Sequence, residues 1–558
     1  MILLLNPPNP KGTVSNKEMM GGFGQLYPAG VPVKVPPLDM VYAAALLKKS
    51  GVDFEVIDCL GLELDAALLK EKLSGKKYAY VFIRTSTATL SFDLAIAALV
   101  KEVCLCKTVF FGPQAGIDSL NILKNPAVDA PITGEPEEAV KLVAVSGFKD
   151  VKGVLYKDDG EFAKNGASAP IILLDALPFP AWEYFPYEKY NIGNLLEGKG
   201  NTSFVLTSRG CPFDCNYCPY PVAQGTVYRK RTAANVVEEI KYLYKKFAIR
   251  KILFRDAEFT LDRQKVLDIC AGIKELKLKW RCETRIDTLD EALIEKMAKA
   301  GCTGINMGIE SGCDRIITAS GRKSIDKEQT VKIMERCREL GINTFCFFII
   351  GLPGDDLSEK LNADISQFTV ATPYPGTRLH AWAEKKKYIE KYSDDMITGY
   401  EALMRNENLT AEQIRVIRNA AQERLDNLGK IKEQNNIELN EHRMAVGLCF
   451  SLFLKKGKKK AVVYGASGLN LKKIEAKGYE IVGVVDEKYF GEKVRGFTVF
   501  PTAVISVLHP EVVIVSHLKR SVNILQYADN IEILEPLALI IMIGRKLKNI
   551  FKKKAARI

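Results

Sequence analysis

The chain has 558 residues and a mass of 62.0 kDa; 47% of its residues are hydrophobic and 26% are charged. This composition excludes a disordered or fibrous protein and predicts three or four globular domains, each with its own apolar core. The net charge is +12, but part of the excess lies in a basic tail at residues 536–558, and the sequence has no zinc-finger or ribonucleoprotein motif, so we do not expect nucleic acid as a partner.

Residues 1–150 alternate short apolar runs with amphipathic stretches. This alternation predicts a doubly wound α/β domain around a parallel sheet, in which ligands bind beyond the carboxyl ends of the strands. Two of these ends carry small or rigid residues that allow a ligand to approach the backbone: Thr85 and Ser86, and then Gly112 and Pro113. The expected strands are Ile2–Leu5, Asp53–Asp58, Tyr78–Ile83 and Thr108–Phe111, and the expected helices are Leu38–Ser50 and Phe92–Val103.

A linker with a small hairpin is expected at residues 151–199, where the alternation stops. Between residues 200 and 400 strands and helices alternate again in units of about 30 residues, which predicts a partial or full (β/α) barrel of the TIM type. The expected strands are Phe204–Thr207, Lys251–Arg255, Trp280–Thr284, Gly304–Gly308 and Thr344–Ile350, and the expected helices are Asn235–Phe247, Arg263–Glu275, Glu291–Ala300 and Lys327–Leu340.

The last part of the chain changes character twice. Residues 401–457 are polar with a helical pattern, and residues 458–535 predict a Rossmann-like domain. The loop at residues 465–468 has two glycines but lacks the third glycine of a dinucleotide fingerprint. We therefore expect a degenerate Rossmann-like domain, in which a role in packing or partner docking is at least as well supported as nucleotide binding.

The strongest chemical signal is a C-x₃-C-x₂-C motif formed by Cys211, Cys215 and Cys218, just after the first expected barrel strand. Three thiolates can bind three irons of a [4Fe–4S] cluster and leave the fourth iron open for another ligand. The alternatives are a structural zinc site and three unconnected thiols. A structural zinc ion normally has four protein ligands, and the nearest histidine is His380, so the pattern favours the cluster.

This motif, with Tyr217 at its aromatic position, resembles that of the radical S-adenosylmethionine (SAM) superfamily. The resemblance implies that SAM chelates the open iron and that an electron from the cluster cleaves it to a 5′-deoxyadenosyl radical. Residues 283–285 are similar to the end of the family's fourth barrel strand, and residues 304–311 to its strand-five motif. The SAM-binding residues implied by the resemblance are Tyr217, Asp256, Glu258, Arg285, Gly308 and Glu310.

Two of these residues, Asp256 and Glu310, are expected to act in SAM binding rather than in folding. The alternative is that they are structural, because an acidic residue at a strand end is commonly a helix cap or an ion-pair partner. The sequence also departs from the family between Gly354 and Phe368, where thirteen residues replace a full helix. This departure puts one barrel helix in doubt.

Residues 1–150 resemble the cobalamin-binding domain that precedes the barrel in one subgroup of this superfamily. The domain contains no histidine, so it offers cobalt no histidine ligand, and Pro136 stands where the subgroup has glycine. The alternative is a flavodoxin-like domain that only supports the barrel. The resemblance implies that the corrin and its nucleotide tail lie along Thr85, Ser86, Gly112, Pro113, Gly134 and Glu135.

Together these resemblances imply an enzyme that uses a [4Fe–4S] cluster, SAM and cobalamin to methylate an unactivated carbon. A radical cyclase or rearranging enzyme on the same scaffold and a non-catalytic iron–sulfur sensor are the alternatives. The implied partners are an electron donor such as flavodoxin or ferredoxin and a small-molecule, lipid or glycan substrate; no catalytic residue is identified. The apolar runs are too short for a signal peptide or for a membrane span of about 20 residues, so we expect a cytoplasmic protein.

Overall fold

The computed structural model describes residues 1–422, except 32, 159–160, 197–198, 324, 356–364, 391–395 and 420, together with six strands between residues 459 and 534. These residues belong to two compact units. The first comprises Met1–Glu310, Asp314–Pro353 and Ala363–Asn406, and the second comprises Ser311–Cys313, Gly354–Asn362 and Glu407–Ile558. Among the described residues, no helix is both long enough and apolar enough to cross a bilayer.

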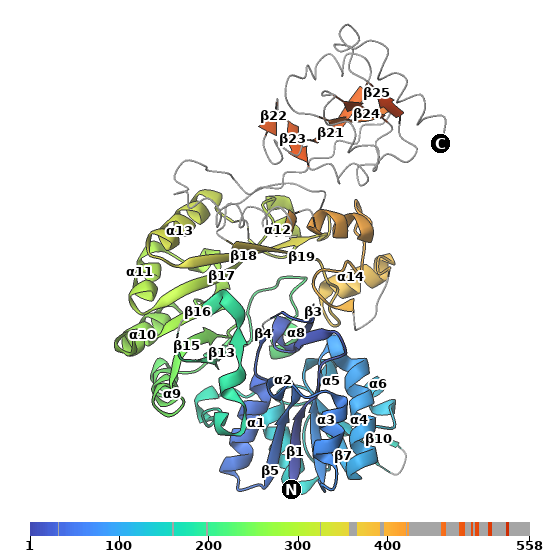
Figure 1. The fold of residues 1–558 in the computed structure, drawn as a ribbon, viewed down its shortest axis with the longest axis vertical. Helices are drawn as coiled ribbons and strands as arrows, with labels where there is room; N and C mark the ends of the chain where they lie inside the picture. Colours follow the sequence, from blue (N-terminus) through green and yellow to red (C-terminus); the bar gives the residue numbers. More distant parts are fainter. Residues whose placement is uncertain are drawn as a thin grey trace. The chain divides into compact units, whose positions relative to one another are not determined.

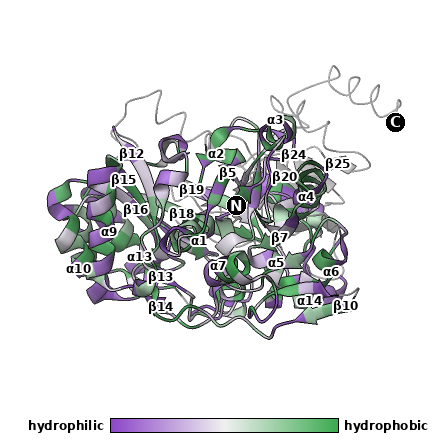
Figure 2. Ribbon diagram, turned by 90° about the horizontal axis from the view of Figure 1, so that it is seen from below, coloured by the Kyte–Doolittle hydropathy of each residue, from purple (hydrophilic) through white to green (hydrophobic). Residues whose placement is uncertain are grey.

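The N-terminal part of the first unit is built on a parallel sheet with the strand order β5-β1-β6-β7-β8. Helices α1 and α7 contact each other, as do α3 and α4, and the two pairs cover opposite faces of the sheet (Figure 1 and Figure 2). The doubly wound fold is therefore confirmed. The elements are β1 (Ile2–Asn6), α1 (Leu38–Lys49), β5 (Phe54–Asp58), α3 (Ala66–Leu73), β6 (Tyr80–Arg84), α4 (Leu90–Cys104), β7 (Lys107–Phe111), β8 (Ala130–Pro131) and α7 (Pro136–Ser146).

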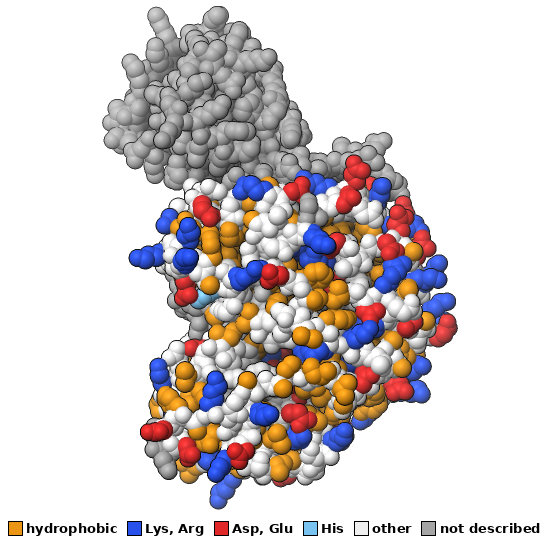
Figure 3. All heavy atoms as spheres, turned by 180° about the vertical axis from the view of Figure 1, so that it is seen from behind, with side chains coloured by type: hydrophobic (Ala, Val, Ile, Leu, Met, Phe, Trp, Pro, Cys, Tyr) orange, Lys and Arg blue, Asp and Glu red, His pale blue; other side chains and the backbone are white. Residues whose placement is uncertain are grey.

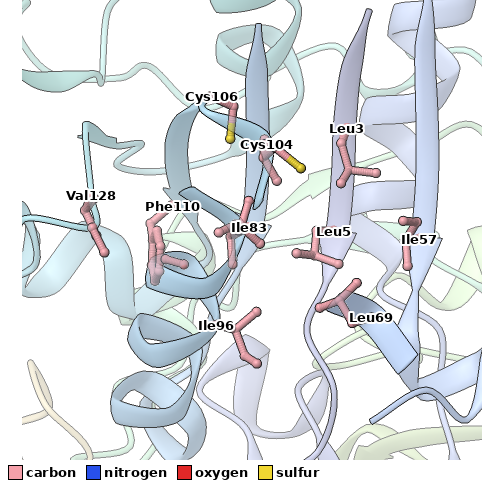
Figure 4. Packing of buried hydrophobic residues seen from close by; sticks show 14 of the residues in the cluster. Leu3, Leu5, Ile57, Leu69, Ile83, Ile96, Cys104, Cys106, Phe110 and Val128 are labelled. Atoms are coloured by element: carbon pink, nitrogen blue, oxygen red, sulfur yellow. The ribbon is translucent and has the colours of Figure 1, made fainter. Parts of the chain in front are cut away.

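One face of this sheet packs on a fully apolar core. Leu5 of β1 and Ile83 of β6 meet Leu69 of α3 and Ile96 of α4, and all four side chains are buried (Figure 4). These strands are apolar on both faces, as parallel strands covered by helices must be. The sequence analysis did not anticipate β8 or the hairpin of β2 (Thr13–Asn16) and β3 (Gln25–Pro28), which follows β1.

The central part of the first unit is a six-stranded parallel sheet in sequence order, and its two outer strands are not paired with each other. It is an open, partial barrel. A side chain caps the N-terminus of each outer helix: Thr232 caps α9, Asp262 α10, Asp290 α11 and Asp326 α13. The elements are β12 (Asn201–Val205), α9 (Ala233–Lys246), β15 (Ile249–Phe254), α10 (Arg263–Ile273), β16 (Lys279–Arg285), α11 (Glu291–Lys299), β17 (Cys302–Glu310), α13 (Lys327–Glu339), β18 (Asn343–Ile350) and β19 (Ile365–Val370).

The barrel differs from the sequence-based expectations in the numbering of its strands and in having one strand more. Residues 283–285 end β16, the third strand of the sheet, and residues 304–310 lie on β17, the fourth. The strand numbers taken from the resemblance, four and five, are therefore wrong by one. A sixth strand, β19, completes the sheet; the short segment at 356–364 that precedes it lies outside the described residues.

The outer helices of the barrel are amphipathic. Both α9 and α10 carry hydrophilic and hydrophobic residues (Figure 2). The buried residues of α9 include Val236, Ile240 and Leu243, which recur at helical spacing. On the face of the first unit in Figure 3, Lys and Arg side chains are interspersed with Asp and Glu. The net positive charge is therefore not gathered into one patch on that face.

Short elements connect the N-terminal part of the first unit to its central part. An antiparallel hairpin is formed by β9 (Leu155–Asp158) and β10 (Glu161–Lys164). In the second unit the strands have the order β22-β23-β21-β20-β24-β25, and β20 is parallel to β21 and to β24. Their bounds are β20 (Lys459–Tyr464), β21 (Tyr479–Val485), β22 (Lys493–Val494), β23 (Phe497–Phe500), β24 (Val512–Val515) and β25 (Glu532–Leu534). Residues 411–419 are helical, whereas the expected glycine loop at 465–468 and the basic tail at 536–558 lie outside the described residues.

Candidate active site

The three motif cysteines lie on a loop at the carboxyl end of the barrel strands. This loop starts after β13 (Ser208–Arg209), which pairs antiparallel with β14 (Arg229–Lys230). Gly210 has a φ of +82°, and a Cβ on it would lie 2.1 Å from the carbonyl oxygen of Val227, so only glycine fits there. The Cys211 N–H then donates to the carbonyl oxygen of Gly225 (3.1 Å). The start of the loop is thus fixed by the β13–β14 ribbon.

The far side of the loop is held by the segment that follows α12 (Asp314–Ala319). The Asn216 N–H donates to the carbonyl oxygen of Ser320 at 2.9 Å, and its side-chain amide donates to that of Ala319 at 3.0 Å. The Cys218 N–H closes a turn on the carbonyl oxygen of Cys215 at 3.2 Å. Both flanks of the motif are therefore anchored to the barrel.

The thiols of Cys211, Cys215 and Cys218 are free and line one cavity of about 200 Å³. Burial raises the pKa of each thiol; at Cys215 the charges of Arg322 and Arg285 oppose that rise. Three sulfur donors and a neighbouring cavity suit a cluster with one open iron. Among the described residues, no three His, Cys, Asp or Glu side chains form a group that could hold a single metal ion.

Five of the six residues implied in SAM binding line this same cavity: Tyr217, Glu258, Arg285, Gly308 and Glu310. The buried Glu258 carboxylate accepts hydrogen bonds from the Arg285 N–H at 2.9 Å and from the hydroxyls of Thr284 and Thr288. Glu258 therefore fixes the end of β16. The Arg285 guanidinium pairs with Asp287 (2.7 Å), lies 4.0 Å from the Phe213 ring centroid and brings positive charge beside the cysteine loop.

The end of β17 forms another part of the cavity wall. Glu310 has a φ of +64° and follows a register shift in the pairing of β17 with β18. Its carboxylate pairs with Arg322 at 2.5 Å, and Arg322 also donates to the Tyr217 hydroxyl at 3.3 Å. A Cβ on Gly308 would lie 2.3 Å from the Glu310 carboxylate, so this glycine makes room for the pair. Burial raises the pKa of Glu310, and the charge of Arg322 opposes that rise.

Asp256 is placed differently, because it does not line the cavity. Its buried carboxylate accepts hydrogen bonds from the Thr207 N–H (3.2 Å), the Thr207 hydroxyl (2.7 Å) and the Ser208 hydroxyl. The ammonium group of Lys265 donates to the same Thr207 hydroxyl at 2.7 Å. Asp256 therefore fastens the chain between β12 and β13, four residues before Cys211.

Several lining residues were not found by the sequence analysis. Alternation along β18 places Phe347 and Ile349 on its inner face, a signal that the strand pattern could have given. The hairpin loop of the N-terminal part contributes Met19 and Met20 from a region with no regular period. Arg322 comes from an irregular turn after α12 and also had no sequence signal. Phe347, Ile349 and the two methionines give the cavity an apolar surface, and Arg322 adds a charge to it.

A second cavity, of about 90 Å³, lies at the carboxyl ends of the N-terminal sheet. Four of the six residues implied in cobalamin binding line it: Gly112, Pro113, Gly134 and Glu135. The other two, Thr85 and Ser86, are buried but do not line it. Tyr220 lines both cavities, so the two adjoin.

The donor and acceptor groups of this second cavity suit the amide-bearing rim of a corrinoid. Arg84 Nη1 and Glu137 Oε2 are buried and have no hydrogen-bond partner among the described residues, and both side chains line the cavity. A carboxamide can accept from the first and donate to the second. Gly112 and Gly134 have positive φ and leave bare backbone beside them. The cavity admits only part of a corrinoid.

Comparison with known proteins gives three findings. Residues 205–363 match the family model of the radical SAM superfamily. An uncharacterized methyltransferase of Pyrococcus horikoshii is 29% identical over 434 residues, which cover 74% of this chain and 89% of that protein. A cytidylyl-2-hydroxyethylphosphonate methyltransferase of Streptomyces wedmorensis is 25% identical over 411 residues, covering 62% of this chain and 77% of that protein.

Among solved structures, the fold is similar to that of TsrM from Kitasatospora setae, a radical SAM methyltransferase determined with cobalamin and a [4Fe–4S] cluster bound. The TM-score is 0.54 at 16% sequence identity, and the match covers 70% of this chain and 76% of that one. This likeness shows the fold.

Proposed function

We propose that this chain, a radical SAM enzyme, binds a [4Fe–4S] cluster through Cys211, Cys215 and Cys218 and methylates an unactivated carbon with the help of cobalamin. The observation that carries the proposal is that the three thiols, with five of the six residues implied in SAM binding, line one cavity that adjoins a second cavity at the carboxyl ends of the N-terminal sheet. When bound, the cluster would supply the electron that cleaves one SAM to a 5′-deoxyadenosyl radical, and cobalamin would supply the methyl group, which a second SAM would replace.

The residues of the first cavity hold and orient SAM in this proposal. Glu310 and Arg322 offer a paired acceptor and donor at the end of β17. The charges of Arg285 and Arg322 lower the pKa of the Cys215 thiol against the effect of burial, and they thereby favour the thiolate that binds iron. Glu258 also lines the cavity, and the hydrogen bond that it accepts from the Arg285 N–H keeps the end of β16 in place.

The N-terminal part holds the corrinoid beyond the ends of β6 and β7. Arg84 and Glu137 supply a buried donor and acceptor, and Gly112 and Gly134 supply bare backbone. The part contains no histidine, so we propose that no histidine from residues 1–150 binds cobalt.

The apolar part of the first cavity positions the substrate and excludes water. Met19, Met20, Phe347, Ile349 and Tyr374 line it, and the buried Tyr374 hydroxyl accepts a hydrogen bond from Gln25 at 3.4 Å. A water-poor wall protects a radical from side reactions. An external reductant, such as a flavodoxin or ferredoxin, supplies the electron, and the substrate is a small molecule, lipid or glycan that reaches this wall.

The test is anaerobic purification of the full chain, followed by corrinoid and iron analysis and by turnover of candidate substrates with methyl-labelled SAM. The proposal predicts bound corrinoid, about four irons per chain and a labelled product one methylene heavier than the substrate. A product of unchanged carbon count would instead indicate cyclisation or rearrangement. Absence of corrinoid after reconstitution with cobalamin would contradict the proposed role of residues 1–150.

A further inference from the structure

A buried group of charges joins the start of α7 to the ribbon that leads into the cysteine loop. Arg209 Nη2 lies 2.5 Å from Glu137 Oε1, and Arg209 Nη1 lies 3.5 Å from Glu135 Oε2. Arg229, on the other strand of the ribbon, lies 2.7 Å from Glu135 Oε1. The exposed fraction is 7% for the Arg209 side chain and 1% for that of Glu137. Glu137 lies in the first turn of α7, where the helix dipole also favours a carboxylate.

Arg209 stands directly before the cysteine loop, whereas Arg229 is on the strand that pairs with it. Arg209 follows Ser208, which Asp256 holds from the barrel, and only Gly210 separates Arg209 from Cys211. The left-handed conformation of Gly210 and the bond from the Cys211 N–H to Gly225 leave this stretch little freedom. The position of the Arg209 backbone therefore sets the position of Cys211.

Stability alone does not account for this arrangement. A buried ion pair is often no more stabilising than a packed apolar pair, because removing both charges from water costs several kcal/mol. The ion pair fixes the position of α7 of the N-terminal part relative to the β13–β14 ribbon of the barrel. Breaking it leaves a buried, partly unpaired guanidinium next to the loop.

We propose that Glu137 and Glu135 are positioning residues that fasten the cysteine loop to the N-terminal part of the chain. They act through Arg209 and Arg229 and touch none of the motif thiols. Both glutamates also line the second cavity. This step rests on the proposed function: a corrinoid bound in the second cavity would contact the residues that hold the cysteine loop. By linkage, its occupancy would then change the affinity for SAM.

The chain offers a matched control in the pair of Arg231 and Glu239. Its side chains are as deeply buried, at 5% and 0% exposure, and it too joins a glutamate of a helix to an arginine near the ribbon. Both residues of this control pair belong to the barrel, so Glu239→Gln removes a buried charge without releasing the link to the N-terminal part.

The experiment is hydrogen–deuterium exchange with mass spectrometry on the full chain, comparing wild type, Glu137→Gln and Glu239→Gln. We expect Glu137→Gln to accelerate exchange over residues 208–218 by about tenfold, the factor that corresponds to one lost hydrogen bond between charged groups. Glu239→Gln should lower the melting temperature but leave exchange over 208–218 as in the wild type. If Glu137→Gln does not fold, Glu135→Gln is compared in its place, with a smaller acceleration expected because the Arg209–Glu137 pair remains.

A second readout follows the cluster itself after anaerobic reconstitution. We expect the electron paramagnetic resonance signal of the reduced protein with SAM to change in Glu137→Gln and to stay as in the wild type in Glu239→Gln. Unchanged exchange over 208–218 in both Glu137→Gln and Glu135→Gln, or equal acceleration in Glu239→Gln, overturns the positioning role. If the wild type gives no iron–sulfur signal, the proposed function fails, while the exchange data still decide whether the glutamates hold the loop.

Discussion

Replacing Asp256 with asparagine separates a structural carboxylate from a SAM-binding one. Asp256 was expected to bind SAM, but its carboxylate accepts from Thr207 and Ser208 beneath the cysteine loop and does not line the cavity. The asparagine side chain would keep the shape of the aspartate and one acceptor oxygen. It would remove the charge that strengthens these hydrogen bonds and would place an amide donor near the Thr207 N–H.

The magnitude follows from the number of donors. A hydrogen bond to a charged group contributes roughly 1.5–3 kcal/mol, against roughly 0.5–1.5 kcal/mol for a neutral one. Three donors meet the Asp256 carboxylate, namely one N–H and two hydroxyls. All three donors reach the same oxygen, Asp256 Oδ1, so their contributions do not add in full. We expect Asp256→Asn to lower the free energy of unfolding by about 2–4 kcal/mol, which is close to the cost of breaking a buried charged interaction.

Urea unfolding of the full chain, followed by circular dichroism, measures this loss. The control is Asp268→Asn, an exposed position on α10, for which we expect a change within about 0.5 kcal/mol. SAM affinity measured without urea, at a temperature well below the transition, should stay within about threefold of the wild type. If Asp256→Asn unfolds like the wild type yet loses SAM binding, then Asp256 contacts SAM and its assignment as a structural carboxylate is wrong.

Three further substitutions test other parts of the account. Glu310→Gln should weaken SAM binding by about tenfold in calorimetric titration, because the pair with Arg322 at the cavity wall loses its charge; unchanged affinity would remove Glu310 from the SAM site. Gly210→Ala should prevent iron uptake on reconstitution, since its Cβ would collide with the Val227 carbonyl oxygen; iron content equal to the wild type would show that the loop tolerates a shift. Burial lowers the pKa of Lys265 below 10.5, although the charges of Asp256 and Asp262 oppose this decrease. As the pH rises, the folded state therefore loses the Lys265 proton before the unfolded state does, and this difference stabilises the folded state. Wild type should therefore gain stability relative to Lys265→Met as pH rises towards 10.5 in urea titrations, and a difference that is constant with pH would contradict the burial of a charged Lys265.

The strand and helix alternation was enough to predict both α/β parts, because parallel strands covered by helices are apolar throughout and their helices carry clear caps. Thr232 and Asp262, for example, start α9 and α10 with side-chain hydrogen bonds that the sequence pattern favours. The hairpin at 13–28 had no such signal. Its residues are mixed in polarity, and their positions depend on contacts such as that of Lys17 with the distant Asp93.

The candidate site was predictable only in part, for a related reason. Spacing identifies Cys211, Cys215 and Cys218, because one short loop carries all three. Asp256 and Glu258 stand two residues apart after β15, yet one faces away from the cavity and the other lines it. Sequence cannot distinguish them, since the direction of a side chain in an irregular turn is set by its hydrogen-bond partners.

The central claim is that the three cysteines hold a cluster that cleaves SAM. The most direct measurement is the yield of 5′-deoxyadenosine when the anaerobically reconstituted full chain is mixed with SAM and a strong reductant, beside a variant in which Cys211, Cys215 and Cys218 are all replaced by alanine. The account predicts 5′-deoxyadenosine from the wild type and none above background from the variant, which should also lack iron. Equal yields from the two proteins, or no 5′-deoxyadenosine from a wild type loaded with its full iron, would contradict it.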